Sequence, residues 1–423
     1  MSHRLPVPAF LPRVLALSAL VVSLGGCTTS TPLPAATSAS REIGIASFNM
    51  AWAGTTAEFD RYLAVCGAPD VAWCETRARW VRGTTAATPE EEARAATCRA
   101  SLLAAAGSRE ALMRIAPCGA YRTGADPAAE RSREAYAEKL EGLRATVARL
   151  VEKEGVSVLA FQEVSGQAVV EEVLGPLRAR FEVCAAPQSS FQTVAFAWDK
   201  AVTERPATCT VNDELAVVES KDEPWRRSRP GLALTLTLGG APVTFLNVHL
   251  KSSCASLVSS ERYPGRLLTD PAEACRVFNR QVPILERWID ETAVKSPRFV
   301  FLGDLNRRID EEQAANVPKS EVRADGTDPA GPNRADANGS VTTRYLWGEI
   351  ADGSPALHQV PLSPSASEEA CKGFSGLDHI VVSDRVKALN EGKLLSRKVA
   401  VEEKPGQRIQ TSDHCPRIVR LTF

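Results

Sequence analysis

The chain has 423 residues, of which 44% are hydrophobic and 24% are charged, and its formal net charge is −1. This composition is typical of a globular protein with a sizeable buried core, which excludes a disordered chain. The near-neutral charge also argues against a dedicated, tight nucleic-acid binder, because such proteins usually carry a basic excess.

The first residues predict an export signal. Arg4 and Arg13 are the only charged residues among the first 26, and an apolar run over residues 14–24 follows them. This run is too short to cross a bilayer core of about 30 Å. It has the length of a signal-peptide core instead.

The end of this segment indicates a lipid anchor. The sequence Leu24-Gly25-Gly26-Cys27 resembles the lipobox of bacterial lipoproteins, whose cysteine is acylated and becomes the new N-terminus. An ordinary signal peptide with an incidental cysteine is the alternative. We therefore expect a signal peptide over 1–26, a flexible Thr/Ser/Pro/Ala-rich tether over 27–41, and attachment of the exported protein to the bacterial cell envelope through Cys27.

Cysteine usage agrees with export. The chain has 11 cysteines, so an even number remains if Cys27 is acylated, which favours disulfides in an oxidising compartment. Their spacing contains no Cys-x-x-Cys pair, so a structural zinc site is not expected. The pairing stays open; along the chain the remaining cysteines are Cys66 and Cys74, Cys98 and Cys118, Cys184 and Cys209, Cys254 and Cys275, and Cys371 and Cys415.

In chain order, the first half predicts a strand, an insertion, a helix and a strand. Residues 42–48 alternate apolar and small side chains, as a strand does. Residues 55–130 are Ala-rich and hold four cysteines, which indicates a disulfide-stapled helical insertion. The next helix has one apolar face and ends before Gly155, and a buried strand follows at 156–161. The face consists of Tyr136, Leu140, Leu143, Val147 and Leu150.

The second half repeats this alternation and predicts a mixed α/β protein. Gly239-Gly240 indicates a hairpin between two strands, and Pro283 either kinks the next helix or marks its start. A stretch rich in Asp, Asn, Gly and Pro predicts a long surface loop. In order, we expect strands at 232–238 and 243–248, a helix at 277–289, a strand at 298–302, the loop at 310–340, and strands at 380–382 and 418–421.

Polar residues stand at the ends of these apolar strands. Strand ends from distant parts of a chain can meet at one rim, where sites are commonly built. Carboxylates and amides suit a hard cation such as Mg²⁺, and histidines transfer protons near neutral pH. The residues are Asn49, Glu163, His249, Asp304 and Asn306 after strands, Asp378-His379 before one, and Asp413-His414 at a turn.

The order of these motifs resembles the endonuclease/exonuclease/phosphatase superfamily over residues 43–423. Six motifs carry the resemblance, namely Ser-Phe-Asn49, Phe-Gln-Glu163, Asn-Val-His249, Gly-Asp304-Leu-Asn306, Leu-Asp378-His379 and Ser-Asp413-His414. Each alone is weak evidence, whereas six in this order are strong. The resemblance implies an α/β (α+β) fold of the DNase I-like kind, a four-layer sandwich of two mixed sheets flanked by helices.

The resemblance also implies roles for the metal-facing residues. Asn49 and Glu163 would hold a catalytic Mg²⁺, with Mn²⁺ or Ca²⁺ as alternatives, and Glu163 would be the principal ligand. Asp413 would approach the metal from its turn. Asp304 and Asn306 would orient the attacking water and contact the phosphate.

The histidines would handle protons and charge. His414 would act as general base or as a hydrogen-bond donor, oriented by Asp378, and His249 would stabilise charge on the phosphoryl oxygens. Which group acts as acid and which as base stays open. His379 should lie on the opposite face of its strand in a structural role, and His358 has no motif around it and should be structural or exposed.

Two basic residues are candidate phosphate contacts. Arg229 follows Arg226 and Arg227 and precedes a proline, as in an Arg-Pro pair that the superfamily often carries near the substrate. Lys251 would share a strand face with His249. The alternative for both is a solvated, charged edge of the sheet.

The insertion between Asn49 and Glu163 leaves the substrate class open. One hypothesis is a phosphodiesterase, such as an extracellular nuclease acting on DNA or RNA. A second is a phosphomonoesterase or a phospholipid-headgroup hydrolase resembling sphingomyelinases or inositol phosphatases. The third is a non-catalytic surface protein. A protein partner is not indicated.

Overall fold

The computed structural model describes residues 40–69, 71, 87–121, 131–188, 190–220, 224–255, 273–314, 345–351, 355–363 and 376–423. All of them belong to one compact unit, Ala39–Phe423. The signal peptide, Cys27 and nearly all of the tether lie outside the described residues. Among the helices described, none combines the length and the apolar character that crossing a membrane requires.

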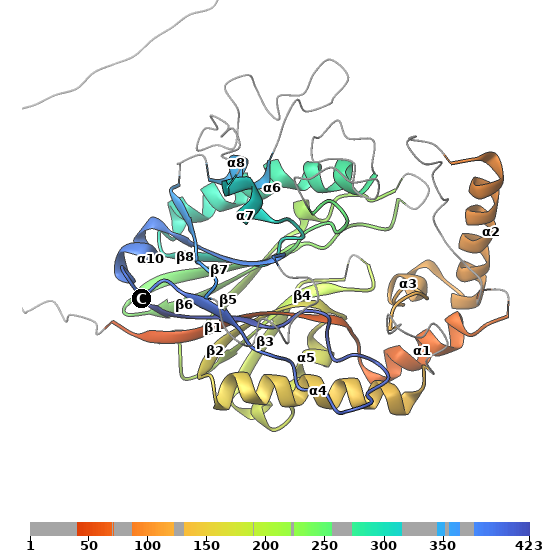
Figure 1. Cartoon of the computed structure of the whole chain (residues 1–423), viewed down its shortest axis with the longest axis horizontal. Coiled ribbons are helices and arrows are strands. Elements are labelled where there is room, and N and C mark those ends of the chain that lie inside the picture. The colour runs from red at the N-terminus through yellow and green to blue at the C-terminus, as the bar shows by residue number, and fades with distance from the viewer. Residues whose placement is uncertain are drawn as a thin grey trace, which may run out of the picture. The chain divides into compact units, whose positions relative to one another are not determined.

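Two six-stranded mixed sheets form the centre of this unit (Figure 1). The first contains β1 (Glu42–Ala53), β2 (Val156–Val164), β3 (Phe181–Ala185), β4 (Thr193–Asp199), β11 (Ser396–Lys398) and β12 (Arg417–Thr422). The second contains β5 (Thr208–Asn212), β6 (Gly231–Leu238), β7 (Ala241–His249), β8 (Phe299–Asp304), β9 (Leu357–Gln359) and β10 (Asp378–Ser383). The strand orders are β11-β12-β1-β2-β4-β3 and β5-β6-β7-β8-β10-β9.

Each sheet has one parallel pair at its centre. These pairs are β1 with β2 and β7 with β8, and the neighbouring strands pair with them antiparallel. A parallel pair needs a crossover connection, usually a helix. Here the crossovers are made by α4 (Arg133–Glu152) and α6 (Glu273–Lys295). The carboxyl ends of β1 and β2 therefore lie at the same end of the first sheet, and those of β7 and β8 lie at the same end of the second.

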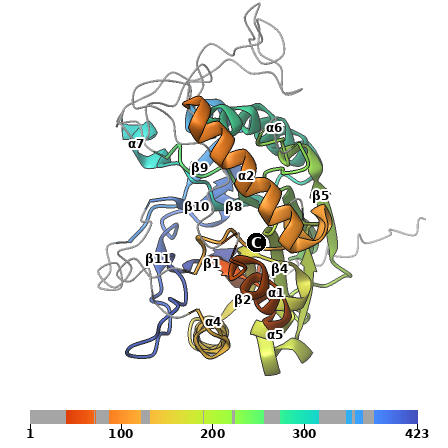
Figure 2. The ribbon, with the colours of Figure 1, turned by 90° about the vertical axis from the view of Figure 1, so that its right-hand side faces the viewer.

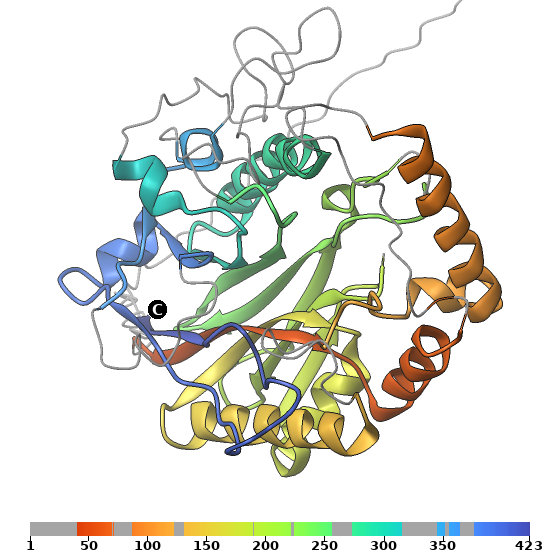
Figure 3. The ribbon, with the colours of Figure 1, turned by 45° about the vertical axis from the view of Figure 1, so that its right-hand side comes forward.

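Helices cover the two outer faces of the paired sheets (Figures 1 and 3). The first sheet is covered by α4 and α5 (Gln167–Leu174), and the second by α6, α7 (Ile309–Ala314) and α8 (Leu346–Ile350). The remaining helices are α1 (Thr56–Cys66), α2 (Pro89–Ala106), α3 (Arg109–Met113), η1 (Gly175–Ala179), η2 (Asp213–Leu215) and α10 (Asp384–Leu389). The predicted four-layer α/β sandwich is confirmed.

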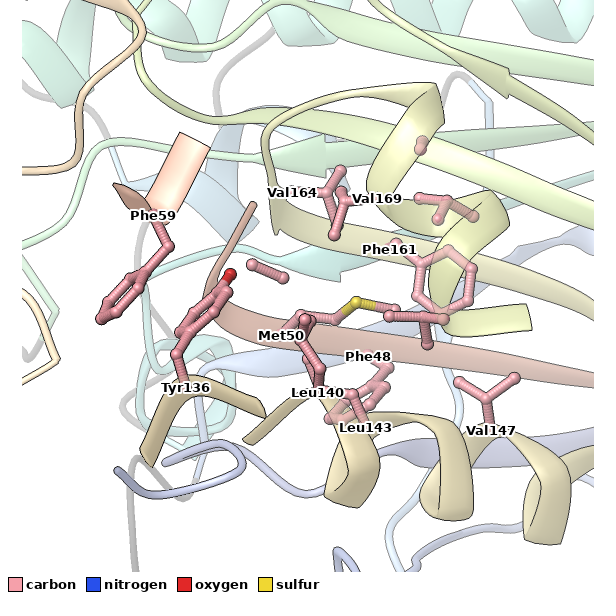
Figure 4. Close-up of a cluster of buried hydrophobic side chains, with 14 of the residues drawn as sticks. Phe48, Met50, Phe59, Tyr136, Leu140, Leu143, Val147, Phe161, Val164 and Val169 are labelled. Carbon is pink, nitrogen blue, oxygen red and sulfur yellow. The ribbon is translucent and has the colours of Figure 1, made fainter. Parts of the chain in front are cut away.

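Three apolar layers hold the sandwich together, because side chains alternate between the two faces of each strand. In β1, Phe48 and Met50 pack under α4, whereas Ile43 and Ile45 face the second sheet. Figure 4 shows the outer layer, where Leu140 and Leu143 of α4 lie over β1. Burial of each such side chain contributes about 1.5–3 kcal/mol to stability. The third layer lies between the second sheet and α6.

The predicted apolar helix face is confirmed in α4. Its residues Tyr136, Leu140, Leu143, Val147 and Leu150 are all buried. Ser132 caps the helix by accepting a hydrogen bond from the backbone N–H of Ala135, which satisfies one of its free donors.

The described part of the insertion is helical and joined to the sandwich by aromatic packing. Phe59 of α1 stacks on Tyr136 of α4 with ring centroids 4.0 Å apart, and Tyr121 meets both rings edge-on. A disulfide joins Cys66 to Cys118. Figure 2 views the molecule from the side that carries α1 and α2, and Figure 1 shows these helices beyond the end at which β1 stops.

The disulfides only partly follow the order of the cysteines. Cys66 pairs with Cys118 rather than with its neighbour in sequence, whereas Cys184–Cys209 and Cys254–Cys275 do join neighbours. Cys98 and Cys415 are also disulfide-bonded. Cys184 lies on β3 and Cys209 on β5, so this bond connects an edge strand of each sheet.

The predicted start of the surface loop is wrong. The surface loop was expected from residue 310, but Ile309–Ala314 forms α7; residues 315–340 lie outside the described residues. The helix predicted at 277–289 lies within α6, which runs from Glu273 to Lys295; of the two alternatives for Pro283, a position inside the helix is the correct one. The strands β3, β4, β5, β9 and β11 were not predicted from the sequence.

Candidate active site

At one end of the space between the sheets, polar side chains replace the apolar ones. Because side chains on a strand alternate with period two, each of these polar residues continues the inward-facing row of its strand. Parallel strands β1, β2, β7 and β8 end here, and β10 begins here. The buried inward-facing residues are Ser47, Asn49, Gln162, Asn247, His249, Asp304 and Asp378. The structure thus brings together the predicted strand-end residues.

A bulge turns Glu163 towards the same place. Regular alternation would send Glu163 to the helix-covered face with Phe161, since Gln162 faces inward. Instead its φ is 57° and the pairing of β2 with β4 shifts between Gln162 and Val164. Such bulges re-aim side chains at sites. The Oε1 atom of Glu163 consequently lies 3.6 Å from Nε2 of His249.

Asp304 stands at the centre of the site. Its Oδ2 accepts a hydrogen bond from Nδ2 of Asn49 at 3.1 Å and lies 3.5 Å from Nε2 of His249. Its Oδ1 accepts from the backbone N–H of Asn306 at 2.8 Å. The register pairs Asp304 with His249 on one side and with Asp378 on the other, so the three side chains start from adjacent positions on β7, β8 and β10.

The acidic groups of this site raise one another's pKa. Burial and then the charge of Asp413 raise the pKa of Glu163 to about 7. Burial likewise raises the pKa of Asp304 to about 6, against the lowering effect of His414. Asp413 itself is half-buried. A cation placed among these carboxylates would relieve both the desolvation and the mutual repulsion.

The donor set fits a hard divalent cation. Asp304 and Asp378 each offer a carboxylate oxygen in the same small cluster, and Oδ1 of Asp378 is buried without a hydrogen-bond partner. Glu163 and the amide oxygen of Asn49 add oxygen donors, and oxygen is the ligand atom that Mg²⁺ prefers. The Asn49 oxygen also accepts from the backbone N–H of Ala51 at 2.9 Å.

Asp378 and His414 form a carboxylate–imidazole pair. Nδ1 of His414 and Oδ2 of Asp378 are 2.8 Å apart, which leaves Nε2 of His414 facing Asp304 at 3.9 Å. Burial lowers the pKa of His414, but the charge of Asp378 and the hydrogen bond to it prevail and raise that pKa to about 10. His414 is therefore an imidazolium at neutral pH.

His249 is in the opposite protonation state. Burial and the nearby charge of Arg229 hold its pKa well below the usual range for histidine. Its Nδ1 is buried without a hydrogen-bond partner. The site therefore contains one neutral and one cationic imidazole, both directed at Asp304.

The His414 loop is fastened to the end of β1. Ser412 Oγ accepts a hydrogen bond from the His414 backbone N–H at 3.0 Å and donates one to the Asn49 carbonyl at 2.7 Å. Lys139 of α4 is 1% exposed and donates from Nζ to the carbonyls of Met50 and Thr411 at 3.0 and 2.5 Å. Burial lowers the pKa of Lys139 to about 8.

Lys139 was missed by the reasoning from sequence, although a signal existed. It lies three positions after Tyr136 and one before Leu140, which places a charged residue on the apolar stripe of α4. A buried lysine requires several acceptors, and here backbone carbonyls of the site supply them.

An amide pair that was also missed joins the two sheets beneath the site. Asn247 of β7 donates from Nδ2 to the carbonyls of Phe161 and Ala195 at 3.0 and 2.9 Å. Its Oδ1 accepts from Nε2 of Gln162 at 2.8 Å. Both are buried, so the bonds are shielded from water.

Arg229 and Lys251 are not at a solvated edge, since each is 6% exposed. Arg229 donates from Nε to the His249 carbonyl at 3.0 Å and from a terminal nitrogen to the Leu250 carbonyl. Lys251 Nζ lies 3.1 Å from a carboxylate oxygen of Glu219. Arg229 thus holds the end of β7 and Lys251 pairs with Glu219, and phosphate contact by either stays a prediction.

The last two histidines lie outside the site, in agreement with the sequence. His379 is buried on the face of β10 opposite Asp378, where Nδ1 meets the Gln359 amide at 2.9 Å and Nε2 meets the Gly376 carbonyl at 2.9 Å. His358 forms a hydrogen bond of 3.0 Å with Asp384 near the surface.

Neither a family profile nor a curated protein matches this chain. Among solved structures, TDP2 from Caenorhabditis elegans is 15% identical with a TM-score of 0.37, over 67% of this chain and 69% of that one. The human Nocturnin catalytic domain with bound sulfate is 13% identical with a TM-score of 0.38, over 66% and 86%. An endonuclease/exonuclease/phosphatase family protein from Bacteroides thetaiotaomicron is 12% identical with a TM-score of 0.38, over 71% and 94%. Similarity at this level assigns no activity, so the function must be argued from the site.

Proposed function

We propose that the protein is a metal-dependent hydrolase of phosphate esters that acts on phosphodiesters, in the manner of the endonuclease/exonuclease/phosphatase superfamily. One observation carries the proposal. Glu163 and Asp304, which come from different sheets, lie within 3.6 Å of the same His249 nitrogen, and a His414–Asp378 pair faces Asp304.

Glu163, Asn49 and Asp413 would hold the cation, with Asp304 beside it. We assign Oδ2 of Asp378 to His414, because metal binding through this atom would compete with the 2.8 Å hydrogen bond, and only Oδ1 is left for the cation. Mg²⁺ suits the oxygen donors best, and Mn²⁺ or Ca²⁺ are alternatives. When bound, the ion would act as a Lewis acid towards the phosphoryl oxygens.

The protein groups divide the proton transfers between them. Asp304 has a pKa of about 6, so it is ionised at neutral pH and can accept the proton of an attacking water. His414, protonated and held at Nδ1 by Asp378, directs Nε2 towards the site and can donate a proton to the leaving oxygen. His249 is neutral and can donate a hydrogen bond to a phosphoryl oxygen without bringing another charge.

The deciding experiment compares substrates with and without the metal. Purified protein would be offered plasmid DNA, a chromogenic phosphodiester and a chromogenic phosphomonoester, in Mg²⁺ and in chelator. We expect diester turnover that chelation abolishes and that Glu163→Gln reduces about 10²–10³-fold. His358→Ala is the matched control, because this histidine lies outside the site. Turnover of the monoester alone, or of neither ester by folded protein, would refute the proposal.

We also propose that Cys27 anchors the protein to the cell envelope. The support is the lipobox-like sequence before it and the Thr/Ser/Pro-rich tether after it. In a bacterial host, the wild type should incorporate labelled palmitate and sediment with membranes, whereas Cys27→Ser should do neither. Equal labelling of both proteins would contradict the anchor.

A further inference from the structure

Two aromatic rings stack at the edge of the proposed catalytic site. The ring centroids of Trp52 and Phe191 are 4.1 Å apart and their planes differ by 24°. Both residues are half-buried, whereas Phe48 and Phe161 on β1 and β2 are fully buried. The stack is therefore not part of the core, and part of its surface is open to a ligand.

The stack is attached directly to the metal-facing carboxylate. The backbone N–H of Trp52 donates to Oε2 of Glu163 at 3.1 Å, and Tyr121 donates its hydroxyl to the Trp52 carbonyl at 2.5 Å. Trp52 has a φ of 63°, which is unusual for a bulky residue. The position of its ring is thus fixed relative to Glu163. A group lying on this ring would belong to the part of the substrate next to the reacting phosphate.

A positive charge lies beside the stack. Trp52, Phe191 and Tyr121 line one pocket together with Arg114, which follows α3, and with Glu58, whose Oε2 accepts hydrogen bonds from Thr55 and Ser165. Arg114 is exposed, and within the described part of the chain its guanidinium has no ion-pair partner. The neighbouring Arg109 lies over the ring of Trp225, 4.3 Å from its centroid. The insertion thus brings a cation to the aromatic surface.

We propose that Trp52, Phe191 and Arg114 form a subsite for one nucleotide of a single-stranded nucleic acid, next to the phosphate that is cleaved. This inference rests on the proposed function and names its substrate class. A nucleobase has a planar face that extends an aromatic stack, and its phosphate matches Arg114. A choline headgroup also favours aromatic rings. Its positive charge would be repelled by Arg114, and the Glu58 carboxylate in the same pocket is already hydrogen-bonded to Thr55 and Ser165.

The first test compares two substrates in each variant. Purified full-length protein in Mg²⁺ would cleave a short oligothymidylate and the same strand with abasic sugars, and the ratio of the two kcat/KM values is the readout. Stacking of one base predicts that Trp52→Ala lowers this ratio about 5- to 150-fold. Trp52→Phe keeps a flat ring and should restore most of it. A ratio of one in the wild type, or an unchanged ratio in Trp52→Ala, would overturn the proposal.

The second test does not depend on turnover. Fluorescence anisotropy of a labelled oligothymidylate in chelator measures binding alone, so it decides the matter even if no diester is hydrolysed. Phe191→Ala should weaken binding of this strand and not of the abasic strand. Arg114→Gln, an exposed change that should not disturb folding, should weaken both and reduce the dependence on log salt concentration by about one unit. Displacement by phosphocholine but not by thymidine monophosphate would overturn the proposal.

Discussion

The two sheets share one plan and differ in how they place their functional groups. Both contain a central parallel pair joined through a helix. In both, a disulfide lies in the connection between the paired strands: Cys66–Cys118 in the first sheet and Cys254–Cys275 in the second. In the second sheet, β7 and β8 pair without interruption up to His249 and Asp304.

The first sheet reaches the same rim through irregular backbone. Its β1–β2 pairing is interrupted after Asn49, and Ala51, Trp52 and Glu163 all have positive φ. Non-glycine residues in this region cost free energy and persist only where the surroundings fix them. The regular sheet thus supplies Asp304 and His249, whereas the irregular one supplies Glu163 and the aromatic stack.

The largest expected effect comes from the pair that connects the two sheets. His414 lies before β12 of the first sheet and Asp378 lies on β10 of the second. His414→Ala should lower kcat for a phosphodiester about 10²–10⁴-fold, the usual contribution of a general acid. Asp378→Asn should have a smaller effect, because the ring remains and only its orientation and charge state change. Steady-state kinetics on both variants measure this, and a near-wild-type rate for His414→Ala would contradict the assigned role.

The second prediction separates the contribution of the insertion to stability from its contribution to catalysis. Replacing Cys66 and Cys118 with alanine removes a cross-link that closes a separation of 52 residues. A loop of this size predicts a loss of about 3–4 kcal/mol in unfolding free energy. Thermal and urea unfolding measure the loss. If the insertion only braces the fold, turnover of a small diester at low temperature should stay within about threefold of the wild type.

A third change tests how the irregular end of β1 is held. Lys139→Met keeps the length of the side chain but leaves the carbonyls of Met50 and Thr411 without their ammonium donor. The buried acceptors predict a loss of about 1–3 kcal/mol in stability. Metal affinity should fall together with kcat, since the Asp413–His414 loop loses its attachment. Calorimetric titration with Mn²⁺ against Lys153→Met, a change at the exposed end of α4, provides the comparison. Unchanged metal affinity would show that Lys139 has only a structural role.

The smallest expected effect concerns the amide pair between the sheets. Asn247→Leu removes a buried group that bonds to Gln162 and to two carbonyls of the first sheet, and this should cost about 1–3 kcal/mol. The added apolar surface offsets part of this cost. The double variant Asn247→Leu/Gln162→Leu should lose less unfolding free energy than the sum of the two single variants, because both partners of the hydrogen bond are then apolar. A double-mutant cycle in urea measures this coupling, and strict additivity would contradict a direct link.

Much of this site could be predicted from the sequence because strand periodicity continues to the strand ends. Asn49, His249, Asp304 and Asp378 each follow the inward-facing row of their strand, so their meeting at one rim is a matter of alternation. Glu163 breaks that rule. The Phe-Gln-Glu163 motif predicts that Glu163 is a metal ligand, whereas strand alternation alone predicts that its side chain packs under α5. The bulge that turns the side chain towards the site has no recognisable pattern in the sequence.

Other features depended on contacts that sequence does not encode locally. The partner of Cys66 is decided by how α1 approaches the residues after α3, and not by spacing. The burial of Arg229 depends on the carbonyls of His249 and Leu250, which a separate strand supplies. Lys139 is the exception, since a charge within an apolar helical stripe can be recognised from the residue pattern alone.

The insertion starts and finishes at the same place. Gly54, just before α1, is hydrogen-bonded through both its N–H and its carbonyl to the hydroxyl of Tyr136, at the beginning of α4. The excursion between them therefore leaves and rejoins the sandwich at one hydrogen-bonded point, and within it Tyr121 holds the Trp52 backbone beside Glu163. On the proposed function, changes in the part of the insertion beyond Tyr121 and Tyr136 should alter the choice of substrate more than the rate of bond cleavage.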